Sequence, residues 1–192
     1  ILEALAMGAD EAILLTDRAF GGADTMATSF ALARAIQKLD EKFDVIFCGK
    51  HAVDADTGQV GPSIAENLKI AQITFVEKVN IENDIIRAKR VIEDGYEIIE
   101  ARLPVLLTVT DKINTPRYPK PLDIMKAARK PIKELSAADI NAPRERVGLA
   151  GSPTTVGKLY TPQPRGAAEI FEGKPTESCE KLIEKLLAEK II

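Results

Sequence analysis

Hydrophobic and polar residues are spaced in two different patterns along this chain. From residue 12 to residue 68, short apolar runs alternate with segments whose apolar residues recur at helical spacing. This pattern predicts strands over 12–15 and 43–48, and helices over 24–39 and 61–68. Asp24 is the expected N-cap of the first helix, because its carboxylate can accept the free N–H groups of the first turn. Such alternation indicates a parallel sheet.

The spacing changes after residue 70, where apolar residues alternate with polar ones at a period of two. Acidic, Asn and Gly residues at 82–84 and 94–95 interrupt this pattern and are typical of tight turns. We therefore predict that the parallel sheet continues into an antiparallel meander, so that the fold class is α/β. The expected strands are 72–81, 84–93, 96–103 and 105–110.

The last part of the chain is less regular. Prolines at 116, 119 and 121 exclude a long helix or a central strand, although residues 122–128 can form a short helix. Residues 142–173 are rich in Pro, Gly, Ser and Thr, and such a segment buries too little of itself to fold alone. We predict two parts, an α/β domain at 1–141 and an extended C-terminal arm at 142–192.

A last helix is expected from residue 177 to about residue 191. Its apolar residues form one stripe, which docks either on a partner subunit or on the sheet of this chain. The stripe contains Leu182, Ile183, Leu186, Leu187 and Ile191.

Composition narrows the functional classes. The chain has 192 residues, 45% of them hydrophobic, which suffices for a sizeable core. A net charge of −3 argues against nucleic-acid binding through bulk charge, and no apolar run approaches the length of a membrane span. The two cysteines, Cys48 and Cys179, and the single histidine, His51, give no basis for a disulfide framework or a metal site.

The most informative segment follows the strand at 43–48. It runs Gly-Lys-His-Ala-Val-Asp-Ala-Asp-Thr-Gly-Gln-Val-Gly-Pro over 49–62 and leads into the next helix. Ligands of open α/β sheets bind beyond the carboxyl ends of strands, and helix N-termini attract anions. The loop is therefore a candidate nucleotide site, although an ordinary solvated loop fits these features equally well.

This segment resembles the adenine-nucleotide loop of electron transfer flavoprotein beta subunits, with His51 at a position where the family usually has Gln. Further segments resemble the family in the same order along the chain. They are 7–10 with 20–28, 103–104, 114–118 with 124–127, and Gly-Ser-Pro-Thr at 151–154. The resemblance implies a parallel sheet of the adenine-nucleotide alpha-hydrolase-like type.

The resemblance also implies a cofactor. The beta site holds AMP in one branch of the family and a second FAD in the electron-bifurcating branch, where that FAD accepts hydride from NADH. Residues 56–62 look more like the bifurcating branch, so we expect FAD, with AMP as the alternative. The expected cofactor-binding residues are Asp24, Thr25, Thr28, Gly49, Lys50, His51, Ala52, Val53, Asp54, Asp56, Thr57, Gly58, Gln59, Val60 and Gly61.

Individual roles follow from chemistry. Backbone N–H groups at 59–61 and the hydroxyl of Thr57 are suited to phosphate, whereas like charge keeps Asp54 and Asp56 away from it. The two carboxylates either order the loop or accept a ribose hydroxyl. Nothing in the sequence indicates an acid–base pair or an activated nucleophile, so any redox chemistry belongs to a flavin.

The family implies partners as well. The resemblance implies an alpha subunit that carries the FAD that passes electrons onward, with the C-terminal arm of the beta subunit packed around it. An acyl-CoA dehydrogenase or similar flavoprotein docks after the Asn-x-Pro-Arg-Tyr motif, where Leu122, Ile124 and Met125 are the expected contacts. Leu122 either fills a partner pocket or packs beneath its own helix. NADH and ferredoxin are further partners in the bifurcating branch, and we expect a cytoplasmic location.

Two expectations remain open. The chain begins with the last turns of a helix, so we expect that it is truncated relative to the family, or numbered from within a longer protein. A nucleotide sensor of the universal-stress-protein type is the alternative function. It would bind a nucleotide without a flavin or an alpha subunit.

Overall fold

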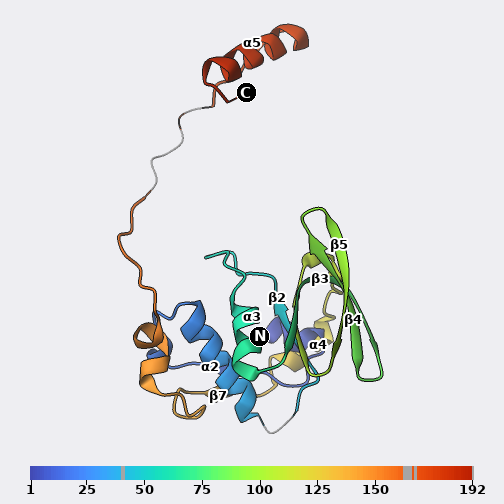
Figure 1. The fold of residues 1–192 in the computed structure, drawn as a ribbon, viewed down its shortest axis with the longest axis vertical. Coiled ribbons are helices and arrows are strands. Elements are labelled where there is room, and N and C mark those ends of the chain that lie inside the picture. The colour runs from blue at the N-terminus through green and yellow to red at the C-terminus, as the bar shows by residue number, and fades with distance from the viewer. Residues whose placement is uncertain (40–41, 162–165, 167, 192) are drawn as a thin grey trace. The chain divides into compact units, whose positions relative to one another are not determined.

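The computed structural model describes residues 1–39, 42–161, 166 and 168–191 (Figure 1). These residues divide into two units, Ile1–Thr155 and Val156–Ile192. The first unit contains the sheets and most of the helices, and the second contains one helix. The two units are described separately.

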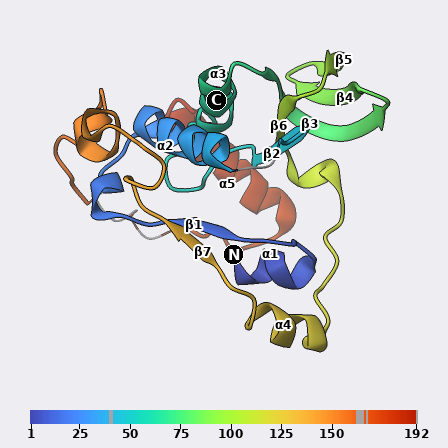
Figure 2. The same cartoon turned by 90° about the horizontal axis from the view of Figure 1, so that it is seen from below.

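The first unit is built on a five-stranded sheet in the order β2-β6-β3-β4-β5. Strand β6 pairs in parallel with β2 on one side and β3 on the other, and the sheet then continues through two antiparallel pairs, β3–β4 and β4–β5 (Figure 2). The predicted change from a parallel sheet to a meander is therefore confirmed. The strands are β2 (Val45–Gly49), β3 (Ala71–Glu82), β4 (Ile85–Ile92), β5 (Gly95–Arg102) and β6 (Val105–Val109).

A second, two-stranded sheet pairs β1 (Ile13–Leu15) in parallel with β7 (Lys133–Leu135), as Figure 2 shows. Strand β7 was not predicted from the sequence. It has three residues, of which only Leu135 is buried, so its pattern is too short to distinguish from a loop.

Helices cover these sheets. The α-helices of the first unit are α1 (Leu2–Met7), α2 (Thr25–Lys38), α3 (Val60–Leu68) and α4 (Pro121–Ala127). Short 3-10 turns connect them, namely η1 (Arg18–Phe20), η2 (Asp111–Ile113), η3 (Arg144–Arg146) and η4 (Gly148–Gly151). Helix α1 ends at Gly8, whose φ of 117° is the left-handed cap conformation that glycine adopts readily. Helix α2 buries small residues on two sides, which lets it lie between two hydrophobic clusters.

The core is centred on β6. Val105, Leu106 and Leu107 are fully buried, and successive side chains of a strand point to opposite faces. Val105 and Leu107 pack with Ile73 and Ile86 of the meander, whereas Leu106 packs with residues of α2 and α3. The central strand therefore joins the meander to the helical layer.

Residues 142–155, which the sequence assigns to the arm, lie in the first unit. Val147 is buried in the same cluster as Ala31 and Leu135, and the N–H of Leu149 donates to the carbonyl of Gly21 at 3.0 Å. Periodicity could not reveal this docking, because only Val147 and Gly148 of the segment are buried and hydrogen bonds to distant residues hold the rest.

The second unit contains helix α5 (Pro175–Ala188), which matches the predicted last helix. Lys185 forms ion pairs with Glu169 and Glu189, at 3.0 and 3.3 Å. Leu182, Ile183 and Leu187 of the apolar stripe are exposed. Among the residues that the structure describes, no helix is long and apolar enough to cross a bilayer.

The docking of residues 147–151 can be tested at Gly148. Its φ is +56°, and a Cβ there would collide with the carbonyl oxygen of Ala19. We predict that Gly148→Ala lowers the free energy of unfolding by about 1–3 kcal/mol, since overpacking and positive φ both oppose the side chain. Denaturant unfolding of the purified chain measures this change.

The matched control is Gly157→Ala, because a Cβ at Gly157 meets no atom within 4 Å and its φ is not positive. Its effect should stay within about 0.5 kcal/mol. Equal stability of the two variants would show that residues 147–151 are not docked as described.

Candidate functional site

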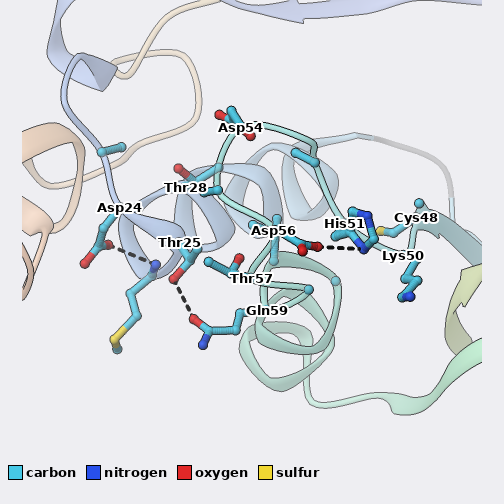
Figure 3. A pocket seen from close by; sticks show the side chains of 18 of the residues that line it. Asp24, Thr25, Thr28, Cys48, Lys50, His51, Asp54, Asp56, Thr57 and Gln59 are labelled. Atoms are coloured by element: carbon cyan, nitrogen blue, oxygen red, sulfur yellow. Dashed lines mark hydrogen bonds and ion pairs between the residues drawn. The ribbon is translucent and has the colours of Figure 1, made fainter. Parts of the chain in front are cut away.

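A cavity of about 830 Å³ opens at the carboxyl end of β2 (Figure 3). Its walls come from the start of α2, the loop between β2 and α3, and residues Pro153 and Thr154. This is the position at which open α/β sheets bind ligands. The loop from residue 49 to residue 59 therefore faces a cavity rather than open solvent alone.

The sequence-predicted residues meet at this cavity with one exception. Val53 is 95% exposed and does not line the cavity. The predicted residues that do line it are Asp24, Thr25, Thr28, Gly49, Lys50, His51, Ala52, Asp54, Asp56, Thr57, Gly58, Gln59, Val60 and Gly61. The lining residues that sequence reasoning missed are Ala23, Met26, Cys48, Ala55, Pro153 and Thr154.

The N-terminus of α3 lies at the base of the cavity because its first turn approaches the sheet closely. A Cβ added to Gly61 would stand 2.6 Å from Cγ2 of Thr108 on β6 and 3.4 Å from Cβ of Cys48 on β2. Only glycine permits this approach. In the described part of the chain no side chain caps α3, so its first N–H groups remain available for an anion.

Contacts within the loop between β2 and α3 hold its conformation. His51 Nδ1 lies 3.1 Å from Oδ1 of Asp56, and the N–H of Asp56 donates to the carbonyl of Ala52 at 3.0 Å. Asp56 and Gly58 have positive φ values of 49° and 62°. Aspartate and glycine tolerate this region better than most residues, which explains their place in the loop.

One side-chain hydrogen bond joins the starts of the two helices. Thr25 at the start of α2 donates its hydroxyl to Oε1 of Gln59, which immediately precedes α3, at 3.1 Å (Figure 3). The starts of the two helices therefore line the same cavity and are linked directly.

Asp24 connects α2 to residues 152–154. Its Oδ1 accepts the N–H groups of Met26 and Ala27 at 2.9 and 3.0 Å, which confirms the predicted N-cap. Its Oδ2 accepts both the N–H and the hydroxyl of Thr154, at 3.2 and 2.9 Å. The hydrogen bond from Ala27 and those from Thr154 lower the pKa of Asp24. The Asp24 carboxylate is thus a structural acceptor as well as part of the cavity wall.

Ser152 completes this connection. Its hydroxyl accepts the N–H of Asp24 at 2.8 Å and donates to the carbonyl of Gly148 at 2.7 Å. In the sequence, the Gly-Ser-Pro-Thr segment at 151–154 is identified only by its resemblance to the family. Its position at the cavity depends on long-range hydrogen bonds to Asp24, which no local pattern indicates.

The expected partner contacts lie elsewhere, on α4. Leu122, Ile124 and Met125 are 69%, 52% and 57% exposed, and none lines the cavity. Leu122 is therefore not buried beneath its own helix. These side chains form an apolar surface, but they belong to a different region from the cavity.

Other groups offer little reactive chemistry. Burial raises the pKa of the Cys48 thiol, which favours the unreactive protonated form. Within the described ranges, no group of three or more His, Cys, Asp or Glu residues is placed to hold a metal ion. The side chains at the cavity are suited to binding and positioning a ligand.

The role of Asp24 predicts a pH-dependent stability. Because its native pKa lies below the usual value of 3.8, its stabilisation is present above that value and is lost as the pH falls through the native pKa. We predict that Asp24→Asn lowers the melting temperature at pH 7, since an amide N–H₂ would face the donors of Thr154. The difference from the unaltered protein should shrink below about pH 4.

Thermal unfolding monitored by circular dichroism between pH 3 and pH 7 measures this difference. Asp10→Asn, at an exposed carboxylate, is the control and should change the melting temperature little at any pH. A melting difference for Asp24→Asn that stays constant down to pH 3 would contradict the assignment.

Comparison with known proteins agrees with this geometry. Residues 1–140 match the family model described as "Electron transfer flavoprotein domain". The chain is 51% identical over 191 residues to the electron transfer flavoprotein subunit beta of Thermoanaerobacterium thermosaccharolyticum, covering 99% of this chain and 73% of that protein.

Two further relatives are named for larger complexes. The caffeyl-CoA reductase-Etf complex subunit CarD of Acetobacterium woodii is 46% identical, with 99% of this chain and 72% of that protein covered. The acryloyl-CoA reductase electron transfer subunit gamma of Anaerotignum propionicum is 40% identical, with 99% and 73% covered. These matches and the meander do not support the universal-stress-protein alternative. The chain therefore belongs to the electron transfer flavoprotein family and is similar throughout its length to the beta subunits.

Proposed function

We propose that this chain binds FAD in the cavity beyond β2 and acts as the beta subunit of a cytoplasmic electron transfer flavoprotein. The observation that carries the proposal is the uncapped start of α3, brought against the loop from residue 49 to residue 59 by the close approach of Gly61 to the sheet. A helix N-terminus beside a glycine-containing loop is suited to phosphate.

The side chains of the cavity fit an adenine dinucleotide. The N–H groups of Val60 and Gly61 and the hydroxyl of Thr57 would donate to phosphate oxygens. A carboxylate would instead repel those oxygens, because both carry negative charge. Asp56 is paired with His51, so Asp54 is the carboxylate left to accept a ribose hydroxyl. A bound flavin supplies the electron-carrying chemistry, and the chain holds and orients it.

AMP in the same cavity is the alternative ligand. Its adenosine and single phosphate would use the same helix start and the same hydroxyl groups. The number of flavins in the isolated complex separates the two ligands, because an AMP-containing subunit adds no flavin absorbance.

The proposed partners are an alpha subunit carrying another FAD and a flavoenzyme that acts on CoA thioesters. Two relatives are named for caffeyl-CoA reductase and acryloyl-CoA reductase complexes, which supports a CoA-thioester enzyme such as an acyl-CoA dehydrogenase. With FAD in the beta site, NADH as electron donor and ferredoxin as a second acceptor fit an electron-bifurcating complex.

The surface of the second unit fits the alpha subunit. The exposed leucine and isoleucine side chains of α5 form an unpaired apolar stripe along a helix. Burial of such a stripe against a partner is a common source of binding energy. We propose that residues 156–191 provide the contact with the alpha subunit.

The loop assignment is tested at Gly58. Its φ of +62° disfavours a side chain, and an added Cβ would lie 3.5 Å from the carbonyl oxygen of Lys50, within the loop wall. We predict that Gly58→Val weakens adenine-nucleotide binding by about tenfold or more, equivalent to about 1.4 kcal/mol, and so lowers the amount of adenine nucleotide that the purified complex retains. Chromatography of the acid-released nucleotide measures this content.

Val53→Ala is the matched control in the same loop. Val53 is 95% exposed and lies outside the cavity, so its truncation should leave nucleotide content unchanged. If Gly58→Val retained as much nucleotide as Val53→Ala, the ligand would lie elsewhere.

The partner surface is tested at Leu122. An exposed leucine that becomes buried in a partner pocket costs about 2 kcal/mol or more on truncation, roughly a thirtyfold loss of affinity. We predict that Leu122→Ala slows electron transfer to the CoA-thioester dehydrogenase, while nucleotide content and melting temperature stay unchanged. Stopped-flow kinetics at varied dehydrogenase concentration measures the effect.

Ile98→Ala is the control, because Ile98 is an exposed apolar residue on β5 rather than on α4. Equal kinetic effects of the two variants, or a fall in stability with unchanged kinetics for Leu122→Ala, would reject the docking role of α4.

A further inference from the structure

A second cavity, of about 1080 Å³, lies next to the first. The two cavities share Lys50 and His51, which therefore form the boundary between them. Phe75 of β3, Arg90 of β4, Val109 at the end of β6 and residues 110–112 line the second cavity. The two cavities therefore adjoin at the side chains of Lys50 and His51.

Phe75 has an unusual backbone conformation at this boundary. Its φ is +57°, a region that bulky side chains rarely adopt. It lies where the pairing of β3 with β6 shifts register, between Ile73 and Val76. Strain of this kind persists only where surrounding contacts impose it.

Thr108 makes a hydrogen bond to Phe75 at this point of the strand. Its side-chain hydroxyl accepts the N–H of Phe75 at 3.0 Å, and the threonine is only 2% exposed. The methyl group of the same side chain, Cγ2, faces α3. It is the atom that a Cβ added to Gly61 would meet at 2.6 Å. Thr108 therefore touches two walls of the site with two different groups.

The Phe75 ring in turn contacts Lys50. The Lys50 ammonium lies 5.4 Å from the ring centroid, within the range of a cation–π interaction. Lys50 lies at the opposite side of the pocket from Asp24 (Figure 3). In the described part of the chain its ammonium has no carboxylate at ion-pair distance. Its charge is therefore available to an anionic ligand at the boundary.

We propose that Thr108 is a positioning residue for a pyrophosphate. Its methyl group sets the position of the α3 N-terminus, which receives the first phosphate. Its hydroxyl holds Phe75 in place, and Phe75 holds the Lys50 ammonium where the second phosphate passes toward the second cavity. This inference rests on the proposed function, since it assumes that the first cavity binds an adenine nucleotide.

The two groups of Thr108 can be removed separately, with AMP and ADP as probes. Thr108→Val keeps the branched shape and removes the hydroxyl, and we expect it to weaken ADP about tenfold while AMP changes less than about twofold. Thr108→Ser keeps the hydroxyl and removes the methyl group, and we expect it to weaken both ligands equally, by about threefold. Isothermal titration of the nucleotide-free complex with the alpha subunit measures both affinities.

Two further variants connect the effect to Lys50. Phe75→Leu leaves the core residue Thr108 intact and should reproduce the selective loss of ADP affinity. Lys50→Met should show the same selective loss of ADP affinity. The double variant Thr108→Val/Lys50→Met should lose no more ADP affinity than Lys50→Met alone, because both substitutions act on one contact.

The outcomes separate the two proposals. If the unaltered complex binds neither probe, the proposed function fails and this inference fails with it. If the unaltered complex binds AMP and ADP equally, or if Thr108→Val weakens both equally, the positioning role is wrong while the nucleotide site stands. Additive losses in the double variant would also reject the role of Lys50.

Discussion

The close packing of α3 against the strands at Gly61 is the constraint on which the site depends. Any side chain there would meet Thr108 of β6 at 2.6 Å, so glycine lets the helix start directly over the central strand. The uncapped helix start then lies at the carboxyl end of β2. The fully buried residues of β6 hold this strand in place by packing on both faces of the sheet.

Much of this arrangement is predictable from the sequence because it depends on local signals. The apolar run before Gly49 and the helical spacing after Pro62 define a strand, a loop and a helix, and the Asp24 cap follows from residue type and position. The meander is equally local, since turn residues separate its strands. The candidate loop residues, apart from Val53, accordingly meet at one cavity.

The remaining features depend on contacts between distant residues. Thr154 reaches the cavity through Asp24, which lies 130 residues away in the chain, and Thr108 acts on Phe75 across a register shift between strands. A threonine in a buried strand has no pattern that distinguishes a packing role from a positioning role. The same limit applies to β7, whose three residues form a strand because β1 offers a free edge.

We propose that this chain carries an adenine nucleotide of its own in addition to the flavin of the alpha subunit. The most direct measurement is the visible spectrum of the isolated two-subunit complex, combined with chromatography of the nucleotides that acid releases from it. We expect one adenine nucleotide bound by this chain, in the form of a second FAD per complex. One FAD per complex with one AMP would keep the cavity assignment and replace its ligand. One FAD with no further adenine nucleotide would contradict the account.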